Sequence, residues 1–168
     1  MSGPSIGRGG TLLIVLWHSR TGASEAMARA VVAGAGSSAA LVAAVDAGPG
    51  DLLDAQGYVF VCPENLGTMT GAMKEMFDRC YYPLLGRVEG RPYATAIAAG
   101  SDGQGAQGQI DRIVTGWRLR RIAEPLIVNL AAQTPEAILA PKTLAAVDRL
   151  RCHELGAGFA EGLRLGIF

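Results

Sequence analysis

The sequence has few of the residues that build metal centres or disulfide frameworks. Its 168 residues include three cysteines, which are widely spaced without a C-x-x-C motif, and two histidines, His18 and His153. An odd number of scattered cysteines does not make a disulfide scaffold, and two histidines are too few for a multi-histidine metal site. We therefore expect neither a disulfide-stapled domain nor a metal site.

Net charge and long apolar runs are also missing. The 15 basic and 15 acidic residues leave a formal net charge of zero, which argues against nucleic acid or a membrane surface as partner. No apolar run reaches the roughly 18 residues of a membrane-spanning helix. The segment MSGPSIGRGG has no apolar core of the kind a signal peptide needs. We interpret residues 1–10 as a flexible leader and expect a cytoplasmic protein.

Apolar residues and glycine are abundant instead. The hydrophobic share of 49% against a charged share of 18% excludes a disordered chain, and the length suits one domain, residues 11–168. The 23 glycines are about twice the usual share of ~7%. Such a surplus indicates tight turns or places where the backbone approaches a ligand.

Short apolar runs alternate with amphipathic segments along the chain. Strands are predicted over residues 12–17, 40–45, 58–62, 92–99 and 122–130. Helices are predicted over residues 24–34, 51–55, 70–82, 109–119 and 142–165, the last with a possible break at 156–158. This alternation predicts an α/β fold with one parallel sheet covered on both faces, whose ligands bind beyond the carboxyl ends of the strands.

The loop after the first strand has the chemistry of a phosphate cradle. Ser19, Thr21 and Ser24 surround Gly22, and the following helix begins with free backbone N–H groups. Hydroxyls and a helix N-terminus together attract an anion. The alternative is that Ser24 or Thr21 only caps the helix. The loop lacks the Gly-Lys-Ser/Thr of a P-loop, which argues against nucleoside triphosphate hydrolysis.

Two motifs make the chain resemble the flavodoxin-like family. Ser19-x-Thr21-Gly22-x-Ser24 is similar to the family's phosphate loop S/T-x-T-G-x-T/S. The segment from Pro63 to Lys74 resembles P-x-x-x-G-x-M-x-G-x-x-K/R of NAD(P)H:quinone oxidoreductases of the tryptophan-repressor-binding-protein type and related FMN reductases. The resemblance implies a three-layer αβα sandwich with a five-stranded parallel sheet in the order 2-1-3-4-5.

The resemblance also implies an FMN site built from three loops. The phosphate would be held by Ser19, Arg20, Thr21, Gly22, Ala23 and Ser24. The isoalloxazine would be lined by Pro63, Asn65, Leu66 and Gly67. A third wall would come from Gly100, Ser101, Asp102, Gly103 and Gly105. The flavin carries the chemistry, so no catalytic side chain is assigned.

The implied activity is transfer of a hydride from NAD(P)H through FMN to a quinone or similar small acceptor, in a homodimer. Neutral charge and the lack of aromatic residues in the second and third loops favour this reductase over an electron carrier. A flavodoxin-type carrier, or a flavin-binding adaptor without reductase activity, is the alternative. The chain is also shorter than the tetrameric quinone reductases that it resembles, which leaves the tetramer and the quinone pocket open.

Other motifs point to different chemistry. The G-x-G-x-x-G at 103–108 follows the fourth strand and lacks the acidic residue that a dinucleotide fingerprint requires. The segment A-G-S-D-G at 99–103 resembles a nucleophile elbow, so a serine hydrolase using Ser101, His153 and Asp111 or Asp148 is a remote alternative. Three roles stay open: that of His18, that of Cys62, and that of the cluster Arg118, Arg120 and Arg121.

Overall fold

The computed structural model describes residues 11–168, and the leader expected at 1–10 lies outside this range. Its strands are β1 (Leu13–Trp17), β2 (Ala39–Ala43), β3 (Gly57–Asn65), β4 (Thr68–Met69), β5 (Pro92–Ala99), β6 (Arg120–Arg121) and β7 (Leu126–Asn129). Its helices are α1 (Ala23–Ala35), α2 (Pro49–Asp54), α3 (Gly71–Leu84), α4 (Gln104–Gly116), α5 (Pro135–Leu139) and α6 (Ala146–Leu165).

The sheet has the predicted order. Its strands run β2-β1-β3-β5-β6, with β7 also pairing with β5, and these pairs are parallel. The expected fifth strand is divided into β6 and β7, because residues 122–125 leave the ladder and Pro125 has no N–H to donate. The short strand β4, which was not predicted, pairs antiparallel with the end of β3.

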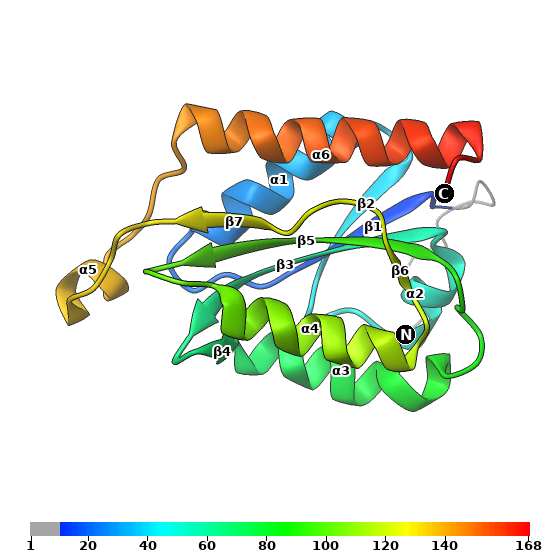
Figure 1. Ribbon diagram of the computed structural model, residues 1–168, viewed down its shortest axis with the longest axis horizontal. Coiled ribbons are helices and arrows are strands. Elements are labelled where there is room, and N and C mark those ends of the chain that lie inside the picture. The colour runs from blue at the N-terminus through cyan, green and yellow to red at the C-terminus, as the bar shows by residue number, and fades with distance from the viewer. Residues whose placement is uncertain (1–10) are drawn as a thin grey trace, which may run out of the picture.

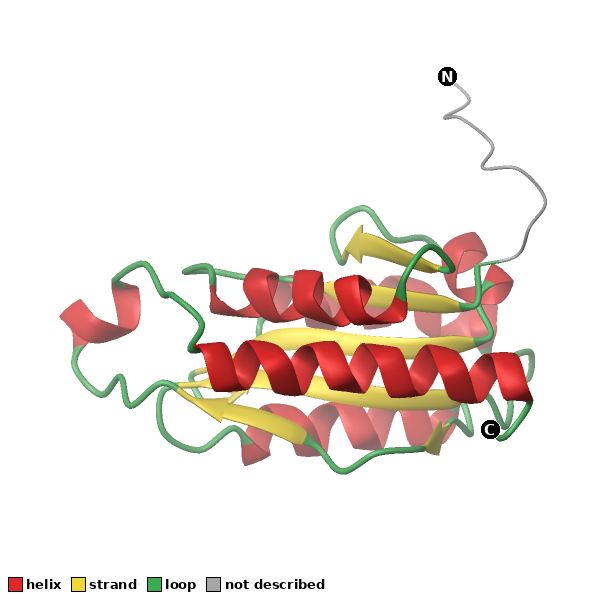
Figure 2. Ribbon diagram, turned by 90° about the horizontal axis from the view of Figure 1, so that it is seen from above, coloured by secondary structure: helices red, strands yellow, loops and turns green. Residues whose placement is uncertain are grey.

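Helices cover both faces of the sheet. Figure 1 shows α1 and α6 on one face and α3 and α4 on the other, and Figure 2 shows α6 lying over the sheet, roughly along the direction of the strands. Alternate residues of β1 belong to different cores: Ile14 and Leu16 pack with α3 and α4, whereas Leu13 and Val15 pack with α1 and α6. The predicted three-layer αβα sandwich is therefore confirmed.

The helix predictions differ from the structure in three details. The helix α4 begins at Gln104 rather than residue 109, so part of the glycine-rich stretch is helical. The short helix α5 was not predicted, and α6 runs unbroken past Gly156 and Gly158. Within residues 11–168, no helix is long and apolar enough to cross a membrane.

Glycine allows α1 and α6 to approach closely. A Cβ built on Gly156 would overlap the carbonyl group of Val31, and one on Gly34 would overlap the carbonyl group of His153. By contrast, nothing lies within 4 Å of a Cβ on Gly158, which faces outward on the same helix. The contact between the two helices therefore requires glycine at Gly34 and Gly156.

This packing predicts opposite effects for two neighbouring substitutions. Gly156→Ala should lower the free energy of unfolding by about 1–3 kcal/mol, because the helices must separate. Gly158→Ala should raise it by about 0.5–1 kcal/mol, because alanine costs less backbone entropy in a helix. Chemical denaturation of both variants measures the difference. Equal effects would contradict the proposed role of Gly156.

Candidate functional site

A pocket opens at the carboxyl ends of the central strands. Four segments line it: the loop 19–24 after β1, the end of β3 at 63–65, the end of β5 at 98–100, and parts of the segment 130–142. Parallel pairing brings the first three to one edge, since Trp17 is level with Val61 and Val61 with Ala96. The fourth follows β7, and the sequence did not indicate its contribution.

The first loop turns sharply into α1. Gly22 has φ 106°, a left-handed conformation that favours glycine, and its N–H donates to Ser19 Oγ at 3.0 Å. The loop therefore places the N-terminus of α1, with its unpaired N–H groups, at the pocket. These N–H groups and the helix dipole favour an anion there.

A buried hydroxyl in this loop has no partner. The Ser24 side chain lines the pocket and is 1% exposed, yet its Oγ makes no hydrogen bond among residues 11–168. A polar atom buried in this way costs free energy unless a ligand or water satisfies it. Arg20 and Lys142 add positive charge to the pocket lining. The donor set therefore fits an anionic group such as a phosphate, which makes simple helix capping an insufficient explanation for Ser24.

The second loop is a tight hairpin. Glu64 is paired with Met69 and Asn65 with Thr68, so Leu66 and Gly67 form a two-residue turn with φ values of 54° and 76°. Positive φ at both turn positions is the type I′ pattern, which favours Asn-Gly because a leucine is strained there. The Leu66 side chain is nonetheless 94% exposed at the rim of the pocket.

Glu64 joins the second loop to the third. Its Oε1 accepts a hydrogen bond from the Gly103 N–H at 2.9 Å, and its Oε2 accepts one from the Ala106 N–H at 3.0 Å. The carboxylate thus caps the N-terminus of α4, where a negative charge is favourable. Sequence reasoning missed this residue because its partners are separated from it by 39 and 42 residues.

Only one predicted residue of the third wall lies in the pocket lining. Gly100 lines the pocket, whereas Ser101 and Asp102 are exposed outside it. Gly103 has φ 91° and precedes α4, and a Cβ on Gly105 would overlap the carbonyl group of Gly67. Gly105 therefore lets α4 pack against the second loop, and Gly103 leaves room for Ile127 of β7. The sequence analysis expected both glycines to contact the ligand.

The remaining predicted residues divide between the lining and its rim. The pocket lining includes Ser19, Arg20, Thr21, Ala23, Ser24, Pro63 and Asn65. Gly22, Leu66 and Gly67 shape the loops beside it and are outside that lining.

His18 links the first loop to the start of α3. Its Nδ1 lies 2.9 Å from Thr70 Oγ1. Burial, and secondarily the charge of Arg20, hold the pKa of the imidazole below its usual range, so His18 is neutral at pH 7. In the described structure, His18 therefore connects the first loop to the N-terminus of α3.

The hydrolase alternative is not supported by the structure. Asp111 is on α4 and His153 is on α6, and these helices lie on opposite faces of the sheet (Figure 1). Asp111 accepts hydrogen bonds from Tyr93 and Arg121, and Asp148 is paired with Arg151. A triad with Ser101 is therefore not assembled.

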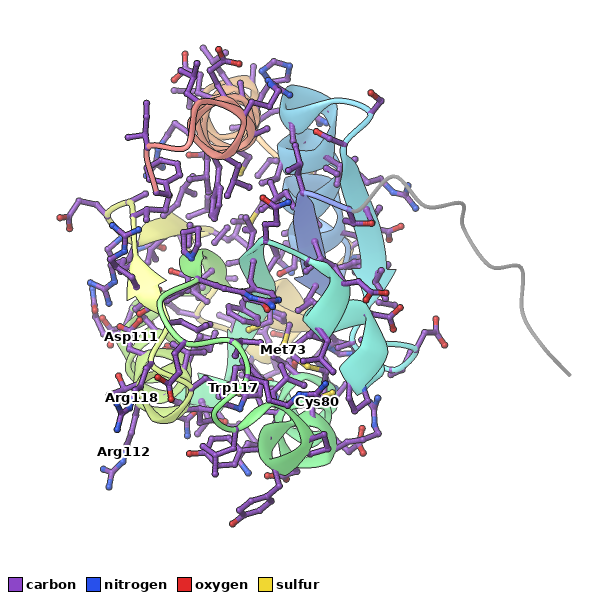
Figure 3. All side chains as sticks on the ribbon, turned by 90° about the vertical axis from the view of Figure 1, so that its right-hand side faces the viewer. Met73, Cys80, Asp111, Arg112, Trp117 and Arg118 are labelled. Atoms are coloured by element: carbon purple, nitrogen blue, oxygen red, sulfur yellow. The ribbon has the colours of Figure 1, made fainter. Side chains whose placement is uncertain are left out.

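Neither Cys62 nor the arginine cluster belongs to the pocket. Burial raises the pKa of the Cys62 thiol to about 12, which excludes a reactive thiolate at neutral pH. Arg120 and Arg121 pair with the first residues of β5, so they lie at the opposite, amino end of that strand. Figure 3, seen from the right-hand side of Figure 1, shows Arg118 and Arg112 at the outside of the molecule there, with Trp117 toward the interior.

Comparison with known proteins gives consistent likenesses. The model of the family described as NADPH-dependent FMN reductase matches residues 43–125, about half of the chain. A solved flavodoxin from the domain Archaea has a TM-score of 0.73 and 18% identity, covering 90% of this chain and 98% of that one. No protein of curated function matches the chain.

Two further structures are similar. A flavodoxin, WrbA-like protein from Agrobacterium tumefaciens has a TM-score of 0.69 and 20% identity, covering 92% of this chain and 98% of that one. The rubredoxin oxygen:oxidoreductase from Desulfovibrio gigas has a TM-score of 0.72 and 13% identity, covering 94% of this chain but 37% of that longer one. At these identities the three structures establish the fold.

The packing of α4 on the second loop predicts unequal effects for two glycines of that helix. Gly105→Ala should displace the hairpin and lower the free energy of unfolding by about 1–3 kcal/mol, because the added methyl group overlaps Gly67. Gly108→Ala is the matched control, since nothing lies within 4 Å of its Cβ, and it should stabilise slightly. Thermal unfolding and amide chemical shifts of residues 64–69 distinguish them. An unshifted hairpin in Gly105→Ala would refute the contact.

Proposed function

Because this chain belongs to the flavodoxin-like family, we propose that the pocket at the strand ends binds FMN for an NAD(P)H-dependent reductase of a small acceptor of the quinone type. The more general conclusion, which does not depend on the identity of the acceptor, is that the protein is a flavin-binding oxidoreductase. The observation that carries it is the buried, unpartnered Ser24 hydroxyl at the N-terminus of α1, inside a pocket lined by three strand ends. An anion would satisfy both that hydroxyl and the N–H groups at the helix N-terminus, and FMN has a terminal phosphate.

The first loop would hold the phosphate end of the cofactor. Ser19 and Ser24 supply hydroxyls, and Thr21 and Ala23 line the same wall. Gly22 keeps the loop in the left-handed turn that directs the N-terminus of α1 to the pocket. Arg20, which is exposed at the mouth, contributes a positive charge. The loop therefore binds by charge and hydrogen bonds rather than by apolar contact.

The second and third loops would hold the ring end. Pro63 and Asn65 line the pocket from β3, and Gly100 lines it from β5. Leu66 and Gly67 form the rim between them. A strained, exposed leucine at this turn supports an apolar contact with a flat ring, because solvent exposure alone gives no reason to keep leucine there.

In this proposal the residues of the chain orient the cofactor and take no part in the reaction themselves. Bound FMN would supply the redox chemistry, namely hydride transfer from NAD(P)H and reduction of the acceptor. Glu64 is engaged with the N-terminus of α4, and His18 with Thr70. We therefore assign neither residue a catalytic role, and the protein would orient the ring and leave one face open. The open face is supported by a pocket lining without aromatic side chains in the described chain.

We further propose that the protein works as a cytoplasmic homodimer, as its family resemblance implies. A one-electron carrier on the same fold is the competing function. It is favoured by the similarity to a flavodoxin and to a flavodoxin, WrbA-like protein. The reductase is favoured by the family description of the matching model and by the neutral net charge.

A visible spectrum tests the proposed function. Purified protein should bind FMN, lose the flavin absorbance rapidly and completely on addition of NADPH or NADH, and regain it when a quinone is added. FMN binding followed by accumulation of protein reduced by one electron would support the carrier. Binding without reduction would support the adaptor, and no binding would refute the flavin site.

Substitution of Leu66 should separate stability from binding. Leu66→Asn is expected to raise the free energy of unfolding by about 1 kcal/mol, because asparagine tolerates the left-handed turn, while weakening FMN binding through loss of the apolar contact. Leu66→Ala keeps the strain, so it should weaken binding without this gain in stability. Denaturation and flavin fluorescence titration measure both quantities. Undiminished affinity in both variants would remove Leu66 from the site.

A further inference from the structure

We infer that Lys142, from the segment between β7 and α6, recognises the phosphate of the cofactor and makes the pocket prefer FMN over riboflavin. The inference rests on the proposed function and assigns a second phosphate-binding element outside the first loop.

The main chain of Lys142 is fastened to the first loop. Its N–H donates to the Thr21 carbonyl oxygen at 2.7 Å, and its own carbonyl oxygen lies 3.3 Å from where a Cβ on Gly22 would be. The side chain lines the same pocket as Thr21 and Ser24. A residue distant in sequence is thus held against the loop that would bind phosphate, by backbone contacts that substitution of its side chain leaves in place.

The ammonium group of Lys142 has only neutral partners. Its Nζ donates to the carbonyl oxygens of Ala137, Ile138 and Ala140, at 2.6, 3.0 and 2.6 Å. Lys74, the other lysine of the chain, instead pairs with the Asp78 carboxylate at 2.6 Å. Among residues 11–168 no ion pair neutralises Lys142. A half-buried cation without a counter-ion among these residues therefore lines the same pocket as the unpartnered Ser24 hydroxyl.

The charge of the pocket supports an anion as the missing partner. Arg20 and Lys142 are its cations, and its acidic residue Glu64 is directed to the N-terminus of α4. A phosphate oxygen is a stronger acceptor than a peptide carbonyl. We expect it to take a hydrogen bond of the ammonium group from one of the three carbonyls.

Exchange of partners would couple phosphate binding to α5. This helix has no buried residue, and Ile138 and Leu139 line the pocket with Lys142. The carbonyls that receive the ammonium group lie at the end of α5. A phosphate bound to the ammonium group would keep the Lys142 side chain in the pocket and out of reach of a protease, whereas riboflavin, which lacks the phosphate, would not.

Titration of FMN and riboflavin into three variants tests the inference. Lys142→Met should weaken FMN binding about tenfold or more, as expected for loss of a charge-assisted hydrogen bond, and change riboflavin binding less than about twofold. Lys142→Arg should retain most of the preference for FMN. Lys74→Met is the matched control, because it removes the other lysine in an exposed ion pair on α3, and it should bind both flavins as the wild type does.

Trypsin provides a second readout on the unmodified chain. FMN should slow cleavage after Lys142, and riboflavin at the same occupancy should not. An unchanged ratio of FMN to riboflavin affinity in Lys142→Met, or equal protection by the two flavins, would overturn the role of Lys142 and leave the flavin site intact. Failure of the wild type to bind either flavin would overturn the proposed function itself. Circular dichroism of each variant verifies folding, and the trypsin comparison holds even where a variant does not fold.

Discussion

The parallel pairing of β1, β3 and β5 is the constraint on which the site depends. Backbone hydrogen bonds hold Trp17 level with Val61, and Val61 level with Ala96, so three strands end at one edge. Each strand is buried on both faces and cannot slide without exposing a core residue. The loops that follow therefore converge, whatever their own sequences, and α1 presents its N-terminus at the place where they meet.

The strand ends bring the loops together but do not determine their conformations. Specific contacts between the loops do so. The Glu64 carboxylate connects the second loop to the N-terminus of α4, and Gly105 lets that helix lie against Gly67. On the other side, the Lys142 N–H holds the segment after β7 against Thr21. Each contact crosses from one strand end to the next, so the loops are joined at the base of the pocket, while Leu66 and α5 remain exposed at its mouth.

Patterns of apolar and polar residues along the chain predicted the strands and helices whose formation depends mainly on neighbouring residues. The apolar runs at 12–17, 58–62 and 92–99 became buried strands, because β-rich apolar runs of this length need burial on both faces. The amphipathic run at 70–82 became α3. Helix boundaries were less predictable: Gln104 to Gly108 form the first turns of α4, because Glu64 caps that N-terminus. A glycine-rich segment read alone indicates a loop.

The sequence by itself determined the alternation of strands and helices and the start of a helix near Ser19, Thr21 and Ser24, since periodicity and helix-start chemistry depend on near neighbours. The strand order was predicted from the family resemblance and not from any local pattern. Only the tertiary structure decided which residues share the pocket. Glu64 and Lys142 line the pocket, whereas Gly103 and Gly105 lie in packing contacts outside its lining. Asp111 and His153 are on different helices, α4 and α6. The physical reason is distance along the chain: contacts between residues far apart in sequence arise from sheet order and helix packing, which no local pattern records.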